Sequence, residues 1–137
     1  MTFRSEHVSV TIERSPADVY AFASSPGQLP RWAAGLSGSI EQIDDEWIAE
    51  SPMGRVKVRF VDRNPFGILD HDVTLPSGVV VSNPMRVFAN GDGSEVVFTV
   101  YQRPGMSREE FTQDVRAVTQ DLTTLKALLE GDQAGNR

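Results

Sequence analysis

The chain has 137 residues and a mass of 15.1 kDa, which suits one domain with a single core and leaves no room for a second. It contains no cysteine and only two histidines, His7 and His71, so disulfides, thiolate metal sites, cysteine nucleophiles and histidine-rich metal clusters are excluded. Thirteen basic against 19 acidic residues give a net charge of -6, which argues against a nucleic-acid partner, because phosphate binding needs clustered Lys and Arg. We expect no metal and no cofactor.

Hydropathy along the chain bears on its location. No apolar run approaches the roughly 18 residues that a membrane-spanning helix needs. The first seven residues include the charged Arg4 and Glu6 and lack the apolar segment of a signal peptide. We therefore expect a cytoplasmic protein with no membrane span, which could be a monomer or a homodimer.

The first elements are a strand and two short helices. Apolar and polar residues alternate over His7–Glu13, a pattern typical of a strand with one buried face. Ser15 can cap a helix and the following proline suits its first position, so a helix is predicted from Pro16 to about Ala23. A second short helix, containing Trp32, is predicted over Leu29–Ala34, ending at a glycine.

The middle of the chain predicts a β-meander. Short β-like runs are separated by turn residues at intervals of roughly ten residues, too short for parallel crossovers, so neighbouring strands should be antiparallel. Asn83–Pro84 removes a backbone donor and predicts a bulge or an edge location there. The six predicted strands are Gly38–Ile43, Trp47–Ser51, Arg55–Arg63, Ile68–Leu75, Val79–Phe88 and Glu95–Gln102.

The last element is a long amphipathic helix. Ser107 and Glu110 have the spacing of a capping box, and Gly131 is predicted to end the helix. Asp114 and Thr119 border the apolar stripe on opposite edges, near enough to reach the rim of a pocket, although residues in such positions are more often simple boundary residues of an amphipathic helix. The single domain is predicted over residues 1–131, followed by a disordered tail at residues 132–137. The stripe consists of Phe111, Val115, Val118, Leu122, Leu125 and Leu129.

This order of elements predicts an α+β domain. In addition, six segments of the sequence resemble those of a known family. They are Ser15–Tyr20, Phe66–His71, Pro84–Phe88, Asn90–Phe98, Arg103–Ser107 and Asp121–Glu130. With Trp32, they resemble the START-like SRPBCC superfamily, and more narrowly its polyketide cyclase/dehydrase-like proteins. The resemblance implies a helix-grip fold: a seven-stranded curved antiparallel sheet wrapped around a long C-terminal helix, with two short helices after the first strand and an apolar tunnel inside. It supplies no shared catalytic residues.

His71 is the most informative polar residue. It shares the parity of Leu69 and Val73 on its strand, so we expect its side chain to point inward, whereas Asp70 and Asp72 should point away. A buried histidine is most often satisfied by a backbone carbonyl or a hydroxyl. The alternatives are that His71 lines a pocket or acts as a general acid/base near neutral pH.

Three functions remain open. The leading hypothesis is a protein that binds a small apolar molecule, of lipid, polyketide or aromatic type, in a cavity between the sheet and the last helix. The second is a polyketide cyclase, aromatase or dehydratase that uses the cavity as a template and His71 as its catalytic acid/base. The third is a protein-interaction module similar to the chaperone cofactors of the superfamily. The predicted ligand-binding residues are Trp32, Val58, Phe60, His71, Val73, Val87, Phe98, Phe111, Val115 and Val118.

Overall fold

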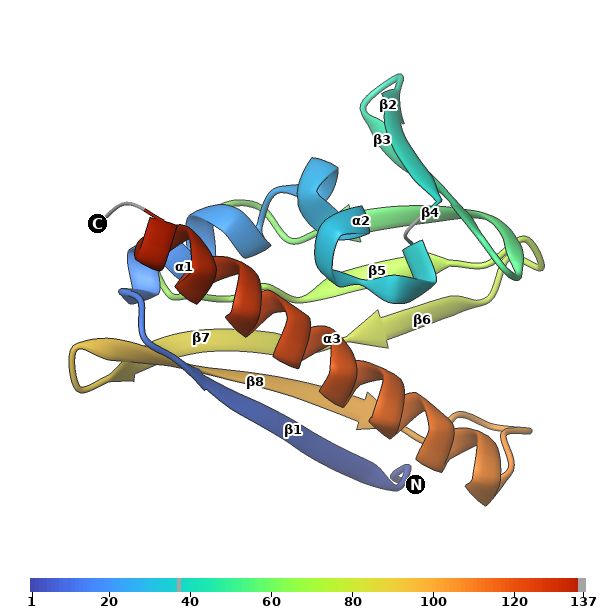
Figure 1. The fold of residues 1–137 in the computed structure, drawn as a ribbon. Coiled ribbons are helices and arrows are strands. Elements are labelled where there is room, and N and C mark those ends of the chain that lie inside the picture. Colours follow the sequence, from blue (N-terminus) through green and yellow to red (C-terminus); the bar gives the residue numbers. More distant parts are fainter. Residues whose placement is uncertain (37, 136–137) are drawn as a thin grey trace.

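A computed structural model describes the backbone of residues 1–36 and 38–135 and the side chains of residues 1–36 and 38–131 (Figure 1). Within these described residues, eight strands and three α-helices follow one another in an α+β order, with two 3-10 helices, Pro26–Gln28 and Ala34–Leu36, on either side of α2. The elements are β1 (Ser5–Ile12), α1 (Pro16–Ala23), α2 (Leu29–Trp32), β2 (Ser39–Ile43), β3 (Glu46–Ser51), β4 (Gly54–Phe60), β5 (His71–Thr74), β6 (Val80–Asn83), β7 (Met85–Asn90), β8 (Gly93–Tyr101) and α3 (Arg108–Gly135).

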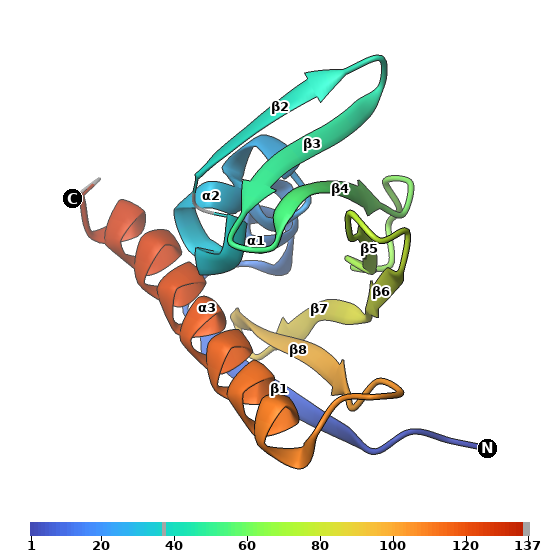
Figure 2. The same cartoon turned by 90° about the vertical axis from the view of Figure 1, so that its right-hand side faces the viewer.

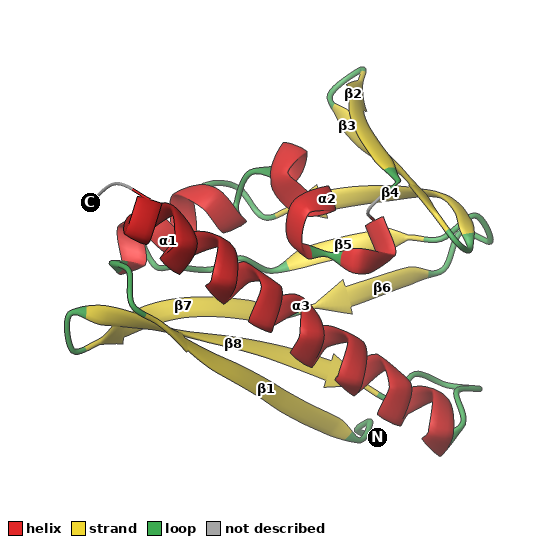
Figure 3. Ribbon diagram, viewed as in Figure 1, coloured by secondary structure: helices red, strands yellow, loops and turns green. Residues whose placement is uncertain are grey.

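The strands form two antiparallel sheets that lie around α3 (Figures 2 and 3). The smaller sheet has the order β1-β8-β7, and the larger has the order β2-β3-β4-β5-β6. The long helix packs mainly against β1 and β8, and α2 contacts it as well. The predicted helix-grip arrangement is therefore confirmed, with eight strands in two sheets in place of seven strands in one.

The division into two sheets occurs at Pro84. One strand is predicted over Val79–Phe88, but the structure has two, β6 and β7, which belong to different sheets. Proline has no backbone N–H to donate to a neighbouring strand, so the ladder ends there. Both β6 and β7 are edge strands, as the edge alternative for Asn83–Pro84 requires.

The segment before β5 joins the two sheets. The backbone N–H of Val87 donates to the carbonyl of Gly67 at 2.9 Å, and that of Leu69 donates to the carbonyl of Met85 at 2.8 Å. Gly67 has φ +71°, and a Cβ atom at this position would overlap the carbonyl oxygen of Val87. Glycine is therefore required for this close approach of two backbones.

Both predicted helix caps are present. Ser15 Oγ accepts a hydrogen bond from the backbone N–H of Asp18 at 3.2 Å at the start of α1. At the start of α3, Ser107 Oγ accepts from the Glu110 N–H at 3.1 Å, and Glu110 Oε1 accepts from the Ser107 N–H at 2.9 Å. These bonds satisfy N–H groups that have no partner within the helix.

The last helix buries its predicted apolar stripe. Leu122 and Leu125 are almost fully buried, together with Phe111 and Leu129, while Val115 and Val118 are half-buried. None of the helices in the described part of the chain is long and apolar enough to cross a membrane.

Two predicted helix ends are wrong. The α3 helix continues past Gly131 to Gly135, because one glycine costs a helix only about 1 kcal/mol relative to alanine and does not by itself end it. The tail predicted after Gly131 is thus helical as far as Gly135, and its residues 136–137 lie outside the described residues. The second helix ends at Trp32, short of the predicted Ala34, where a 3-10 turn begins.

Candidate functional site

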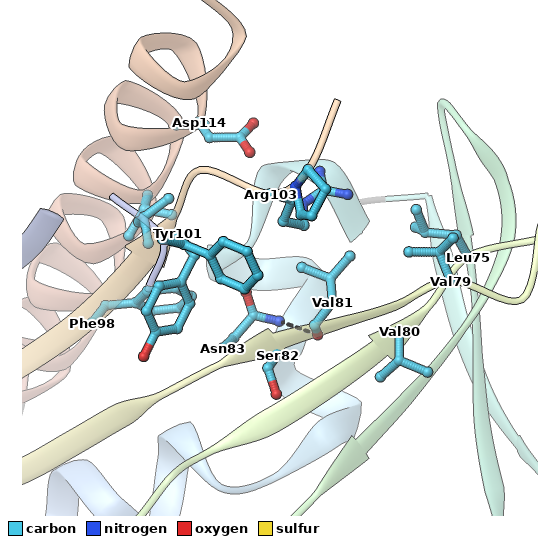
Figure 4. Close-up of a pocket in the computed structure, with 15 residues that line it drawn as sticks. Leu75, Val79, Val80, Val81, Ser82, Asn83, Phe98, Tyr101, Arg103 and Asp114 are labelled. Atoms are coloured by element: carbon cyan, nitrogen blue, oxygen red, sulfur yellow. Dashed lines mark hydrogen bonds between the residues drawn. The ribbon is translucent and has the colours of Figure 1, made fainter. Parts of the chain in front are cut away.

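A cavity of about 690 Å³ opens where the two sheets separate (Figure 4). It lies between β6, the end of β8 and the first half of α3. Five of its side chains carry polar atoms, namely Ser82, Asn83, Tyr101, Arg103 and Asp114. The rest of the lining is apolar and consists of Phe3, Leu75, Val79, Val80, Val81, Phe98, Val100, Pro104, Ala117 and Val118.

The register of the strands explains this opening. β7 begins at Met85, opposite Phe98, and the Thr99 N–H still donates to the Pro84 carbonyl at 2.9 Å, so only the last two residues of β8 pair on the β1 side alone. β6 belongs to the other sheet and does not continue the ladder there. The space between β6 and the end of β8 is therefore bordered by α3 and by the segment around Arg103.

Two of the polar lining groups are already hydrogen-bonded within the protein. The amide nitrogen of Asn83 donates to the carbonyls of Val81, at 3.1 Å, and His71, at 3.3 Å. The hydroxyl of Ser82 donates to the carboxylate of Asp72 at 3.0 Å. These side chains hold β5 and β6 together, and because their donors are used in this way they can offer a ligand only acceptor oxygens.

Arg103 and Asp114 differ from Asn83 and Ser82 in their hydrogen bonding. Both side chains are half-buried, and neither has a hydrogen bond or an ion pair within 4.0 Å to any residue that the structure describes. Burial raises the pKa of Asp114, the positive charge of Arg103 opposes this rise, and the negative charge of Glu110 adds to it. The pKa of Asp114 lies above its ordinary value as a result, since burial disfavours the charged form.

His71 is buried, 8% exposed, and its ring nitrogen contacts the segment just before its strand. Its Nδ1 lies 2.9 Å from the carbonyl oxygen of Leu69, and its ring stacks on Phe60 and meets Phe98 edge to face. A carbonyl oxygen can only accept, so Nδ1 carries the proton and Nε2 carries the lone pair. Burial lowers the pKa of His71, although the Leu69 carbonyl and the carboxylates of Asp70 and Asp72 oppose this shift.

The aspartates beside His71 point elsewhere, as predicted. Asp70 accepts from the Arg86 guanidinium at 3.1 Å and from the backbone N–H of Met85 at 2.9 Å. Its burial would raise the pKa of this carboxylate, but these hydrogen bonds outweigh burial and hold the pKa below its ordinary value. With Asp72 bonded to Ser82, this strand forms no His–Asp catalytic pair.

The structure places two of the predicted ligand-binding residues, Phe98 and Val118, in the lining of this cavity. Val58 and Phe60 line a second cavity, also of about 690 Å³, and half of its ten lining residues are charged. Phe60 and His71 border a small depression of about 280 Å³, and Val87 lines a groove beside α1.

The other predicted residues pack in or against the core. Val73, Phe111 and Val115 do so, and none of them lines any of the four cavities and grooves described above. Trp32 is 3% exposed, and its Nε1 has no hydrogen-bond partner among the described residues.

The sequence analysis predicted none of the cavity lining that comes from the β5–β6 hairpin, and it did not predict Arg103. The clue available was Asn83–Pro84, since an edge strand next to a helix leaves an opening. Asp114 was identified as a residue that could reach a pocket rim, and it does line the cavity. Within the described residues, no group of three or more His, Asp or Glu side chains is arranged to hold a metal ion.

Comparison with known families gives one match. Residues 5–130 match a family model described as "Polyketide cyclase / dehydrase and lipid transport". No curated protein matches the chain by sequence.

Solved structures share the fold at low sequence identity. XoxI from Bacillus cereus has a TM-score of 0.73 at 15% identity, covering 91% of this chain and 94% of its own. DynU16, described as a protein in the dynemicin biosynthetic locus, has a TM-score of 0.71 at 13% identity, over 92% of this chain and 47% of DynU16. The Aha1 dimer from Colwellia psychrerythraea has a TM-score of 0.69 at 15% identity, over 93% and 96% of the two chains. At these identities the likeness establishes the fold alone.

Proposed function

Because the chain belongs to the polyketide cyclase/dehydrase and lipid transport family, we propose that it binds one small, mostly apolar molecule in the cavity between β6, β8 and α3. The observation that carries this proposal is the cavity itself. Its volume of about 690 Å³ lies within the range of roughly 300–1,000 Å³ that is usual for small-molecule sites. Its lining also has the usual character, apolar with a few polar groups.

The ligand would contact side chains from three elements. Phe98 and Val100 of β8, Val81 of β6 and Val118 of α3 supply apolar surface. Apolar surface removed from water contributes about 25 cal/mol per Å², so a ligand of naphthalene size gains enough from burial to bind measurably. We place His71 next to this site through its ring contact with Phe98.

The test is to block the cavity with a bulky residue. Ala117 lines the cavity and is exposed, so Ala117→Trp fills part of the space at little cost to folding. Ala127→Trp is the matched control, because Ala127 is also exposed on α3 but does not line the cavity. We expect Nile red to fluoresce with the native chain and with Ala127→Trp, and to lose its signal with Ala117→Trp. Equal signals from both variants, or none from the native chain, would contradict the proposal.

The second candidate function is catalysis of a cyclase or dehydratase type by His71. The observation that favours it is the tautomer: with Nδ1–H held by the Leu69 carbonyl, Nε2 has a lone pair that can accept a proton. The lowered pKa keeps this imidazole neutral at pH 7.

This candidate is tested by ¹⁵N NMR in a His7→Gln background, where His71 is the single histidine. Addition of 2-naphthol should move the Nε2 resonance while Nδ1 stays protonated. If the ligand binds and the Nε2 resonance does not move, His71 has no contact with it and the catalytic role is rejected.

A further inference from the structure

We propose that the cavity between β6, β8 and α3 selects apolar molecules whose polar end is a neutral group that both donates and accepts hydrogen bonds, such as a hydroxyl or an enol, and disfavours ammonium and phosphate head groups. The inference rests on the proposed function and adds the class of ligand. It follows from the placement of Arg103 and Asp114 in the same cavity wall.

The two charged side chains face the same part of the cavity. In Figure 4 the carboxylate of Asp114 points from α3 toward Arg103, which lies in the segment between β8 and α3. The charge of Arg103 acts on Asp114, yet the two groups do not form an ion pair within 4.0 Å. The gap between them is therefore wider than a direct contact and can receive a polar group of a ligand.

The hydrogen-bonding capacity of the pair defines that group. A guanidinium only donates hydrogen bonds, and an ionised carboxylate only accepts them. A ligand atom between them must accept from Arg103 and donate to Asp114 at once. A hydroxyl oxygen does both, and an ether oxygen can only accept.

The charges of Arg103 and Asp114 also define which head groups of a ligand are disfavoured. An ammonium group near Asp114 is brought close to the positive charge of Arg103, and a phosphate near Arg103 is brought close to the negative charge of Asp114. Like charges repel more strongly in a half-buried site than in water, because the effective dielectric constant is lower. A neutral head group avoids both penalties.

Two other polar groups of the wall cannot provide both a donor and an acceptor. The amide N–H groups of Asn83 and the hydroxyl proton of Ser82 are already donated to groups of β5 and β6, so these side chains can only accept from a ligand. Tyr101 is 36% exposed, so water reaches it in the free protein. The raised pKa of Asp114 agrees with a half-buried carboxylate that lacks a donor until a ligand supplies one.

The test uses four probes that share one apolar body: 2-naphthol, 2-methoxynaphthalene, 2-(aminomethyl)naphthalene and 2-naphthyl phosphate. Affinities are measured by isothermal titration calorimetry at pH 7. We expect 2-naphthol to bind about tenfold more tightly than 2-methoxynaphthalene, which corresponds to one hydrogen bond to a charged group. The ammonium and phosphate probes should bind at least about tenfold more weakly than 2-naphthol.

Two substitutions should change the selectivity in opposite directions. Asp114→Asn removes the negative charge, so 2-naphthyl phosphate should gain about tenfold in affinity while the ammonium probe gains nothing. Arg103→Met removes the positive charge and should favour the ammonium probe instead. Glu109→Gln and Arg116→Met are the controls, because they make the same charge changes at exposed positions of α3 outside the cavity lining.

The outcomes separate this inference from the proposed function. If 2-naphthol and its methyl ether bind equally, or if the control variants change selectivity as much as Asp114→Asn and Arg103→Met, the head-group inference is wrong while ligand binding stands. If neither Nile red nor any of the four probes binds to the native chain, the proposed function fails with it.

Discussion

At the scale of single residues, three ionisable side chains show how burial and partners divide their roles. His71 is buried with a backbone partner, so it is kept neutral. Asp114 is half-buried in the cavity wall without a partner among the described residues. Asp121 is half-buried on the same helix but accepts a hydrogen bond from the Ala34 N–H at 3.1 Å, so it supports the turn after α2.

Asp121 should make the stability of the fold depend on pH. Burial raises the pKa of Asp121 to about 6 despite its hydrogen bond with the Ala34 N–H. Between pH 3.8 and about 6 the folded chain keeps a proton here that the unfolded chain has lost, so the stabilising contribution of this group is present below pH 3.8 and is lost as pH rises through about 6. In urea unfolding, the free energy of unfolding of Asp121→Asn relative to that of the native chain should increase by about 2 kcal/mol as the pH is raised from 4 to 7.

Asparagine retains an acceptor for the Ala34 N–H, so this substitution isolates the charge. Glu109→Gln is the control for the loss of a carboxylate at an exposed position of α3. A difference between Asp121→Asn and the native chain that stays constant over this pH range would mean that the Asp121 carboxylate is solvated in both states.

At the scale of elements, the junction between the two sheets determines where the cavity opens. Pro84 ends β6, and the backbone pairing of Gly67 with Val87 fixes the position of β7 beside the segment before β5. If β6 and β7 formed one unbroken strand that paired with both β5 and β8, one continuous sheet would close the gap beside β8. The opening is thus a consequence of a missing donor at one residue and a close backbone contact at another.

Gly67→Ala should be severely destabilising, whereas Gly91→Ala should not. Both glycines have positive φ, +71° and +58°, which costs an alanine about 1 kcal/mol. A Cβ atom at Gly67 would also overlap the Val87 carbonyl, while one at Gly91 meets nothing within 4 Å. Chemical denaturation should show a loss of about 1 kcal/mol for Gly91→Ala and about 3 kcal/mol or more for Gly67→Ala. Similar losses of stability for the two variants would show that the backbone around Gly67 and Val87 shifts at little cost to admit a Cβ atom.

At the scale of the whole molecule, the free energy needed for local opening should be highest in the paired strands β1 and β8 and lowest in the β2–β3 hairpin. β8 has strands on both sides and its alternate residues are buried, whereas β2 is an edge strand with four of its five residues exposed. Figure 2 shows the β2–β3 hairpin projecting from the rest of the molecule. Its ion pairs with β4, such as Lys57 with Glu46, are exposed and contribute little.

Amide hydrogen exchange tests this gradient. We expect the amides of Val96 and Phe98 to be among the slowest to exchange, and those of Gln42 and Ile43 to be among the fastest, because local opening needs little free energy where few apolar contacts are lost. Strong protection of β2 would contradict this expectation. It would indicate that another surface, such as a second copy of the chain, covers the hairpin in solution.

The sequence alone was sufficient for most of the elements and for the direction of individual side chains. Alternation and helical periodicity report which face of an element avoids water, so the inward position of His71, the outward position of Asp70 and the buried stripe of α3 were predictable. The capping box of α3 was predictable as well, since it depends only on residues three apart.

Only the tertiary structure decided where the sheets separate and which side chains meet there. Periodicity carries no information on pairing between residues far apart in the chain, so it identified inward faces but not which of them border one cavity: only Phe98 and Val118 of the candidates line the cavity between β6, β8 and α3. The cavity wall joins the β5–β6 hairpin, the end of β8 and α3, and it brings Arg103 and Asp114 to the same wall. That juxtaposition depends on the break at Pro84 and the approach of Gly67 to Val87, because long-range contacts alone fix the distance between two surfaces.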